Sequence, residues 1–144
     1  MSHIDQTNFI KKFKEFYINK NFNKDISILE IGSLDVNGSI RNLFDFASEY
    51  IGIDLEKGPN VDLILNGTDI DKLNKSFDII ISCECFEHAK DWKEIFDKMC
   101  QISKPNSLKS TQNAIEIETK STTVSYKHLR AHETPDHLVC RRVL

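Results

Sequence analysis

Residues 28–39, ILEIGSLDVNGS, contain the first side chains whose types and spacing could do chemistry. Glu30 stands near the end of an apolar run, and Gly32 and Ser33 begin the polar turn that follows. Because glycine lacks a Cβ, a ligand can lie against the main chain at such a turn, and the Glu30 carboxylate can fix the turn or meet a cation. These residues predict a binding site at the end of a strand.

A second carboxylate, Asp54, closes the next apolar run, in the segment YIGIDLEK. In a doubly wound sheet, an acidic side chain at this position can accept hydrogen bonds from both hydroxyls of a ribose. A nicotinamide-type dinucleotide enzyme would carry the pattern G-x-G-x-x-G, but the turn has only Gly32 and Gly38. Glu30, the turn and Asp54 together favour a different ligand that contains a nucleoside.

The elements that must position these residues alternate between strands and helices. Apolar runs predict strands at 27–31, 50–55, 61–65 and 77–82, and helical spacing of apolar residues predicts helices at 5–19, at 40–47 and from about 91. Buried strands that alternate with helices indicate a parallel sheet covered on both faces. The sequence therefore predicts an α/β fold with a Rossmann-like, doubly wound and mostly parallel sheet.

Two local features of this sheet are less regular. Only residues 56–60 join the second and third strands, which is short for a parallel crossover, so the third strand is either short and offset or not parallel. Asp91, with Glu94 three residues later, predicts a capping box at the start of the last helix. That helix should end before a turn at Lys104-Pro105-Asn106.

Composition limits the classes of partner. The 144 residues have a net charge of −3, which provides no general attraction for nucleic acid. No apolar run approaches the roughly 18 residues that span a bilayer, and we expect a cytoplasmic protein. The amphipathic helix at 5–19 could lie on a membrane surface, although packing on the sheet is the favoured interpretation.

Four cysteines could form two disulfides, but a cytoplasmic location favours reduced thiols; they are Cys83, Cys85, Cys100 and Cys140. Cys83 and Cys85 form C-x-C and not the C-x-x-C of common zinc sites. We therefore predict no metal site.

Residues 27–106 resemble the class I S-adenosylmethionine-dependent methyltransferases of the broad type-11 group. SILEIGSLDVNG is similar to their glycine-rich cofactor loop, YIGIDLEKGPNVDLIL to the ribose-binding strand and its successor, and SFDIIISCECFEHAKDW to the fourth strand and its loop. ISKPN matches the turn before their fifth strand. The order and spacing of these segments carry the resemblance.

The resemblance implies S-adenosylmethionine as the cofactor and methyl transfer by direct displacement to an O, N, C or S nucleophile. It places Glu30, Gly32 and Ser33 around the methionine part of the cofactor. It also places Asp54 at the ribose hydroxyls, with Leu55 beside it. The acceptor is not identified, and small molecules, glycans and lipid precursors all fit.

At the adenine end, Asn66 takes the place of an aspartate that commonly binds the adenine amino group, with the backbone of Gly67 and Thr68 at the ring. An amide oxygen can accept the same hydrogen bond without charge, which predicts weaker cofactor affinity.

The loop after the fourth strand would line the mouth of the site with Cys83, Glu84 and Cys85, followed by Glu87 and His88. A histidine can remove a proton at neutral pH, although the family often has a Glu-His pair here without a catalytic role. His88 and Glu84 are therefore weak catalytic candidates, and the sequence identifies no other.

The chain changes character after Asn106. Residues 107–112 are polar where the family has an apolar fifth strand, so we expect an incomplete sheet of four strands with residues 79–81 at an exposed edge. The string SYKHLRAHETPDHLVCR resembles translated sequencing-adapter DNA, which argues against a metal site at His128, His132 and His137. We expect the N-terminal part of a methyltransferase domain at 1–106 and a divergent tail at 107–144, non-native from about 121.

A truncated enzyme of this kind could be inactive as given. The alternative function is therefore a Rossmann-like fragment that binds the nucleotide cofactor without catalysis.

Overall fold

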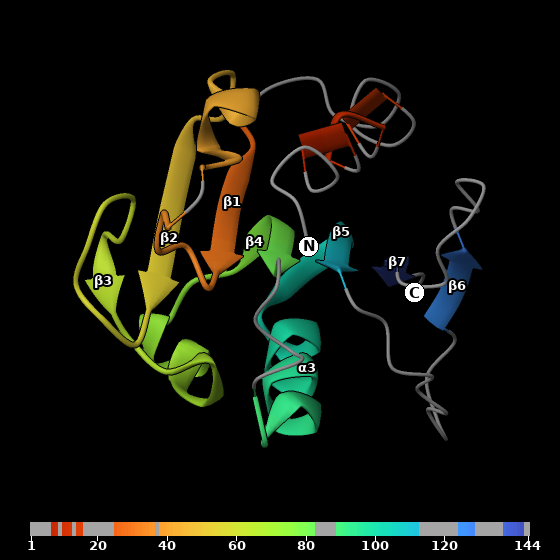
Figure 1. Cartoon of the computed structure of the whole chain (residues 1–144). Coiled ribbons are helices and arrows are strands. Elements are labelled where there is room, and N and C mark those ends of the chain that lie inside the picture. The colour runs from red at the N-terminus through yellow and green to blue at the C-terminus, as the bar shows by residue number, and fades with distance from the viewer. Residues whose placement is uncertain are drawn as a thin grey trace.

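The computed structural model describes residues 7–8, 10–12, 14–15, 25–36, 38–82, 89–112, 124–128 and 137–142, with side chains as far as Lys104. Its strands form one sheet in the order β3-β2-β1-β4-β5-β7-β6 (Figure 1). They are β1 (Ser27–Ile31), β2 (Glu49–Asp54), β3 (Leu63–Ile64), β4 (Phe77–Ser82), β5 (Ser103–Gln112), β6 (Val124–His128) and β7 (His137–Arg142). The 3-10 helices η2 (Arg41–Phe44) and η3 (Gly67–Leu73) and the α-helix α3 (Trp92–Gln101) connect them.

The pairing of the strands is mostly parallel. β1 pairs with β2 and β4, β2 with β3, and β4 with β5, all in parallel. β7 lies antiparallel between β5 and β6. The predicted α/β, Rossmann-like and mostly parallel sheet is confirmed.

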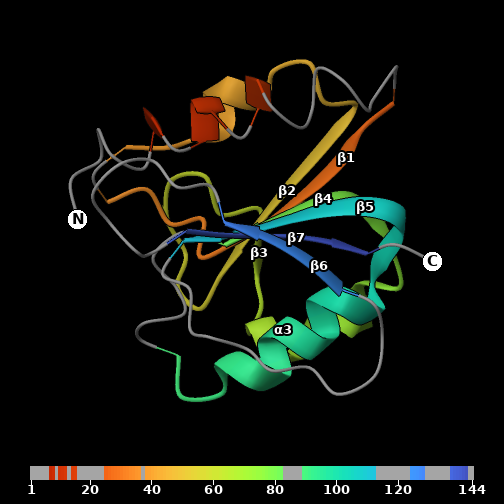
Figure 2. The ribbon, with the colours of Figure 1, turned by 90° about the vertical axis from the view of Figure 1, so that its right-hand side faces the viewer.

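Two apolar clusters hold the sheet between two helical layers (Figure 2). The N-terminal helical residues and η2 cover one face, where Ile10, Ile26, Ile28, Ile40, Phe44, Ile79 and Ile81 are buried. On the other face, η3 and α3 pack on the sheet, and the buried residues of this cluster are Leu29, Ile31, Ile53, Ile70, Phe77, Ile80, Ile95, Phe96, Met99 and Ile102. Every residue of β1 is buried, because a central parallel strand faces apolar core on both sides.

The third strand is short and parallel, which decides between the two alternatives. β3 pairs only with the end of β2, Leu63 with Ile53 and Ile64 with Asp54. Because β3 pairs only with the last two residues of β2, the chain between the two strands has a short distance to cover. A loop without a helix is long enough for this connection. This loop stays close to the carboxyl ends of the strands.

The expectation that the sheet stops at four strands is wrong. β5 runs parallel to β4 and pairs Leu108 with Ile79 and Ser110 with Ile81, so residues 79–81 are not at an edge. Backbone hydrogen bonds to a free strand do not require apolar side chains, and a polar segment can therefore take this position. The predicted turn at 104–106 lies inside β5, where the register shifts between the pairs Phe77–Ser103 and Ile79–Leu108, as expected at a proline that cannot donate a hydrogen bond.

The helices differ from the predictions in length and capping. The helix predicted at 40–47 is the four-residue η2, because the turn after β1 takes up most of the connection to β2. α3 begins after Asp91 as predicted, but no side chain caps it, so the capping box is wrong. The described residues between 7 and 15 are helical, and Ile10 is fully buried against the sheet, as the packing interpretation predicts.

The tail contributes β6 and β7 to the sheet, but the predicted division at residue 106 and the non-native origin of residues from about 121 stay predictions. Of the histidines in the tail, His132 lies outside the described residues. Among the described helices, none is long and apolar enough to cross a membrane.

Candidate cofactor-binding site

The residues predicted from the sequence meet at one edge of the sheet, because parallel strands end side by side. Glu30 lies near the carboxyl end of β1, Asp54 at the end of β2, and Asn66 just after β3. After β1 the chain turns at Gly32, whose φ of 79° suits a residue without a Cβ. The backbone amides of Gly32 and Ser33 both donate to the carbonyl of Ile53, at 2.9 and 3.0 Å, which holds the glycine turn against the end of β2.

The Asp54 carboxylate joins the glycine turn to the turn after β2. Its Oδ2 accepts from the amide of Leu34 at 3.0 Å, and its Oδ1 accepts from Leu55 at 2.7 Å and from Glu56 at 3.4 Å. A carboxylate has about four acceptor positions, and the Glu56 contact is long, so the half-buried Asp54 can accept further hydrogen bonds. Asp54 therefore shapes the site and also offers acceptors to a ligand.

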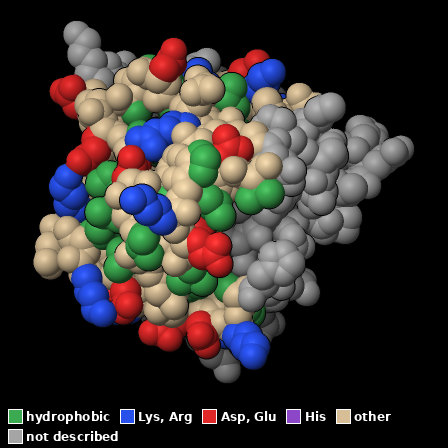
Figure 3. Space-filling view, turned by 60° about the vertical axis from the view of Figure 1, so that its left-hand side comes forward, with side chains coloured by type: hydrophobic (Ala, Val, Ile, Leu, Met, Phe, Trp, Pro, Cys, Tyr) green, Lys and Arg blue, Asp and Glu red, His purple; other side chains and the backbone are tan. Residues whose placement is uncertain are grey.

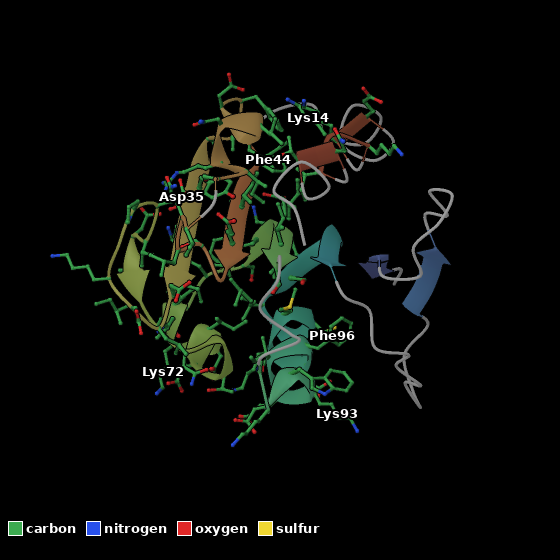
Figure 4. All side chains as sticks on the ribbon, in the orientation of Figure 1. Lys14, Asp35, Phe44, Lys72, Lys93 and Phe96 are labelled. Atoms are coloured by element: carbon green, nitrogen blue, oxygen red, sulfur yellow. The ribbon has the colours of Figure 1, made fainter. Side chains whose placement is uncertain are left out.

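A close approach at Gly52 packs the loop after β2 onto the glycine turn. A Cβ at Gly52 would lie 2.4 Å from the carbonyl oxygen of Asn60 and 2.7 Å from Ser33 Oγ, so only glycine fits. The same loop is tied to the turn by Asn60 Nδ2, which donates to Asp35 Oδ2 at 3.1 Å, with Asp35 near β2 in Figure 4. The loop and the turn thus form one packed unit at the strand ends.

Asn66 is the N-cap of η3. Its Oδ1 accepts from the amide of Thr68 at 3.1 Å, so this amide already has a partner and is less available to a ligand ring than the resemblance implies. Gly67 is buried against Ile95 of α3, which holds the start of η3 on that helix. The Asn66 side chain itself is exposed.

Glu30 is a buried carboxyl group with an altered pKa. Its side chain is 4% exposed, and the hydroxyl of Tyr50 donates to Oε2 at 2.8 Å. Burial removes water from the charged form and raises the pKa to about 7, while the Tyr50 hydrogen bond and the Arg41 charge oppose that rise. The negative charges of Asp35 and Asp54 add to it.

Tyr50 and Arg41 are the part of this site that the sequence analysis missed. Arg41 extends from η2 over the ring of Tyr50, 5.0 Å from its centroid, and forms an ion pair with Asp62 at 3.0 Å. A sequence signal for this contact was present. Tyr50 and Gly52 are two residues apart in β2 and so share one face of the sheet, as Ile28 and Glu30 do in β1. Without the register of the two strands, this spacing does not pair Tyr50 with Glu30.

The mouth of the site is only partly described. Residues 83–88, which include the predicted Cys83, Glu84, Cys85, Glu87 and His88, lie outside the described residues. Four exposed apolar side chains follow or accompany the strand ends at this edge of the sheet, namely Val36, Leu55, Leu63 and Ile64. On the face of the molecule drawn in Figure 3, hydrophobic side chains are scattered among charged ones. No cluster of possible metal ligands occurs within the described segments.

A family model described as a methyltransferase domain matches residues 2–134. The chain belongs to this methyltransferase family. Methyl transfer that depends on S-adenosylmethionine is the activity of the family, so the resemblance seen in the sequence is confirmed at this level. No protein of curated function matches the sequence significantly.

Solved structures of other methyltransferases share the fold at low sequence identity. Magnesium protoporphyrin IX methyltransferase ChlM from Synechocystis PCC 6803, crystallised with bound SAM, has a TM-score of 0.68 at 9% identity and covers 96% of this chain and 80% of its own. The N-methyltransferase NodS from Bradyrhizobium japonicum WM9 has a TM-score of 0.67 at 12% identity, with 99% and 98% covered. The plantazolicin methyltransferase BamL, solved with SAH, has a TM-score of 0.61 at 21% identity over 74% of this chain, which spans 46% of BamL.

Proposed function

We propose that this methyltransferase domain binds S-adenosylmethionine across the carboxyl ends of β1, β2 and β3 and transfers its methyl group to a small-molecule, glycan or lipid-precursor acceptor. The observation that best supports this proposal is that Glu30, the glycine turn, Asp54 and Asn66 lie together at one edge of the sheet. A cytoplasmic location belongs to the same proposal.

The described residues fit the cofactor. Two buried hydroxyls, Ser33 Oγ and Ser82 Oγ, have no hydrogen-bond partner in the part of the chain that the structure describes, and both lie at this edge of the sheet. A buried hydroxyl without a partner is costly, so a polar ligand at this edge would be favoured. Asp54 would accept from the ribose hydroxyls, and exposed Leu55 would offer an apolar surface beside them.

The bound cofactor supplies an activated methyl group, and the chain therefore needs to provide mainly proximity and alignment. Gly32 and Ser33 would let the methionine part lie against the backbone, and Glu30 would meet its ammonium group. Cys83 would line the same mouth, and His88 and Glu84 stay the candidates for proton removal from the acceptor.

Titrating S-adenosylhomocysteine into the full chain by calorimetry tests the proposal directly. We expect saturable binding with one site per chain. Adenosine alone should bind more weakly, because it lacks the methionine part that Glu30, Gly32 and Ser33 would contact. Absence of any saturable heat for S-adenosylhomocysteine would contradict cofactor binding by this chain and favour a fragment that does not bind the cofactor.

Replacing Asn66 by aspartate should tighten cofactor binding modestly. Aspartate caps a 3-10 or α-helix as well as asparagine does, so η3 should persist, and the new charge strengthens a hydrogen bond from the adenine amino group. We expect about two- to ten-fold higher affinity for S-adenosylhomocysteine by calorimetry. Asn74→Asp, at the other end of η3, is the control and should leave the affinity unchanged. Weaker binding by Asn66→Asp would show that this side chain does not lie at the adenine ring.

A further inference from the structure

Residues from β2 and η2 hold the buried carboxyl group of Glu30 in place. The Tyr50 hydroxyl, from β2, donates to Glu30 Oε2 at 2.8 Å. Two groups contact Tyr50 in turn: its ring packs on Phe44 at 6.0 Å between centroids, and the Arg41 guanidinium from η2 lies 5.0 Å from its centroid. These two contacts restrict the position of the Tyr50 ring and therefore of its hydroxyl.

Arg41 is itself held in place. Its guanidinium donates to the backbone carbonyl of Tyr50 at 3.1 Å and pairs with the Asp62 carboxylate at 3.0 Å. Asp62 also accepts from the amide of Gly52 at 2.7 Å, next to the point where Gly52 pairs with Glu30. A positive charge is thus fixed on the side of the sheet that carries Glu30.

The charges near Glu30 are unbalanced. Among the described residues, Asp35 from the glycine turn and Asp54 from the end of β2 disfavour a negative charge on Glu30, and Arg41 favours it. Burial also disfavours the carboxylate. β4, the strand on the other side of β1, places the apolar Ile81 beside Glu30. The hydrogen bond from Tyr50 and the charge of Arg41 are therefore the two described contributions that favour ionised Glu30.

We propose that Tyr50 and Arg41 are positioning residues that favour the carboxylate form of Glu30 over its protonated form, that this carboxylate pairs with the ammonium group of the cofactor, and that cofactor binding is therefore coupled to proton loss from the protonated fraction of Glu30. This inference rests on the proposed function. The chemistry is simple and balanced: protonated Glu30 releases its proton to solvent, and the carboxylate that remains pairs with the cationic ligand. The ligand then binds more tightly as the pH rises through neutrality, and its affinity levels off above that range.

The first measurement follows Glu30 without any ligand. The side-chain carboxyl ¹³C signal of Glu30, identified by its loss in Glu30→Gln, is titrated by NMR in the full chain. The titration midpoint should lie near 7 in the parent chain and rise by about one pH unit in Tyr50→Phe, which keeps the ring but removes the donor. Arg41→Gln should also raise it, and Arg41→Lys, which keeps the charge, should stay closer to the parent.

The second measurement follows the affinity for S-adenosylhomocysteine by calorimetry at several pH values between 6 and 8.5, a range about the neutral midpoint. The parent chain should lose up to about tenfold in affinity for each pH unit below the midpoint, as expected for one linked proton. In Tyr50→Phe the same loss should begin at higher pH, and in Glu30→Gln it should disappear. Asp78→Asn changes another carboxylate, hydrogen-bonded to Ser27 at the opposite end of β1, and should leave the pH profile as it is.

The outcomes separate this inference from the proposed function. A Glu30 midpoint that does not move in Tyr50→Phe and Arg41→Gln overturns the positioning role, even if the ligand binds. Binding that does not depend on pH in the parent chain overturns the proton coupling. Absence of ligand binding at every pH overturns the proposed function and the coupling together, whereas a shifted midpoint in that same chain still supports the contact between Tyr50 and Glu30.

Discussion

Replacing Asp54 by alanine should weaken the binding of S-adenosylhomocysteine by roughly ten- to a hundred-fold. Hydrogen bonds to a charged group contribute about 1.5 to 3 kcal/mol, and each 1.4 kcal/mol changes a binding constant about tenfold. Two effects act in the same direction here. Alanine removes the acceptors for the ribose hydroxyls, and it also releases the Leu34 amide of the glycine turn and the Leu55 amide of the turn after β2.

Calorimetry and unfolding measurements on matched variants separate these two effects. Asp54→Asn keeps an acceptor oxygen for the Leu34 amide but loses charge, and we expect it to bind between the parent and Asp54→Ala. Asp78→Ala is the control, because it also removes a carboxylate that accepts a hydrogen bond from a backbone amide. Asp78 accepts from the Ser27 amide, which lies far from the site. Asp78→Ala should lower stability and leave affinity for the ligand unchanged. Equal affinity of the parent chain and Asp54→Ala would remove Asp54 from the cofactor site.

Replacing Phe44 by alanine should lower the free energy of unfolding by about 3 to 5 kcal/mol, the usual range for removal of a buried aromatic ring. Phe44 is 2% exposed and fills the layer between η2 and the sheet, where it packs against Tyr50 (Figure 4). Since small domains are stable by only about 5 to 15 kcal/mol, much of the folded population could be lost. Urea-induced unfolding measures the change.

Phe46 is the matched control for Phe44, because it lies two residues further along the same turn and is 41% exposed. Phe46→Ala should cost less than about 1 kcal/mol. Phe44→Leu keeps most of the apolar volume and provides a folded variant, with an expected cost below that of the alanine. A similar loss in Phe44→Ala and Phe46→Ala would contradict the burial of Phe44 in this layer.

Much of the fold follows from patterns of apolar residues over short stretches. The apolar runs in β1 and β4 are nearly continuous because these strands are buried on both faces, and such runs are visible without any tertiary contact. Parallel strands end at the same edge, so Glu30 and Asp54 could be placed together from the sequence once both were assigned to strand ends. The glycine turn could be read for the same reason, since the need for a residue without a Cβ at Gly32 is local.

Three features could not be predicted from the sequence: the fifth strand, the short connection before β3 and the short helix η2. They depend on which strand edge has unpaired backbone groups and on the distance between the ends of consecutive elements. The segment that forms β5 is polar, and it becomes a strand because the edge of β4 offers backbone partners. The short connection before β3 is sufficient only because β3 pairs with the end of β2. Likewise η2 is shortened by the length of the turn before it. The local spacing of apolar residues contains no information about strand edges or about distances between elements.

The environment of Glu30 shows most clearly which features follow from local sequence and which follow from tertiary contacts. The residue pattern was enough to place a carboxylate near the end of a buried strand beside a glycine turn. The pairing of Ile28 with Tyr50 and of Glu30 with Gly52 depends on the register of the folded sheet, and this register brings the phenol hydroxyl to the carboxylate and Arg41 over the ring. The protonation of Glu30 depends on burial and on charges from separate segments, because electrostatic interactions act through space and not along the chain.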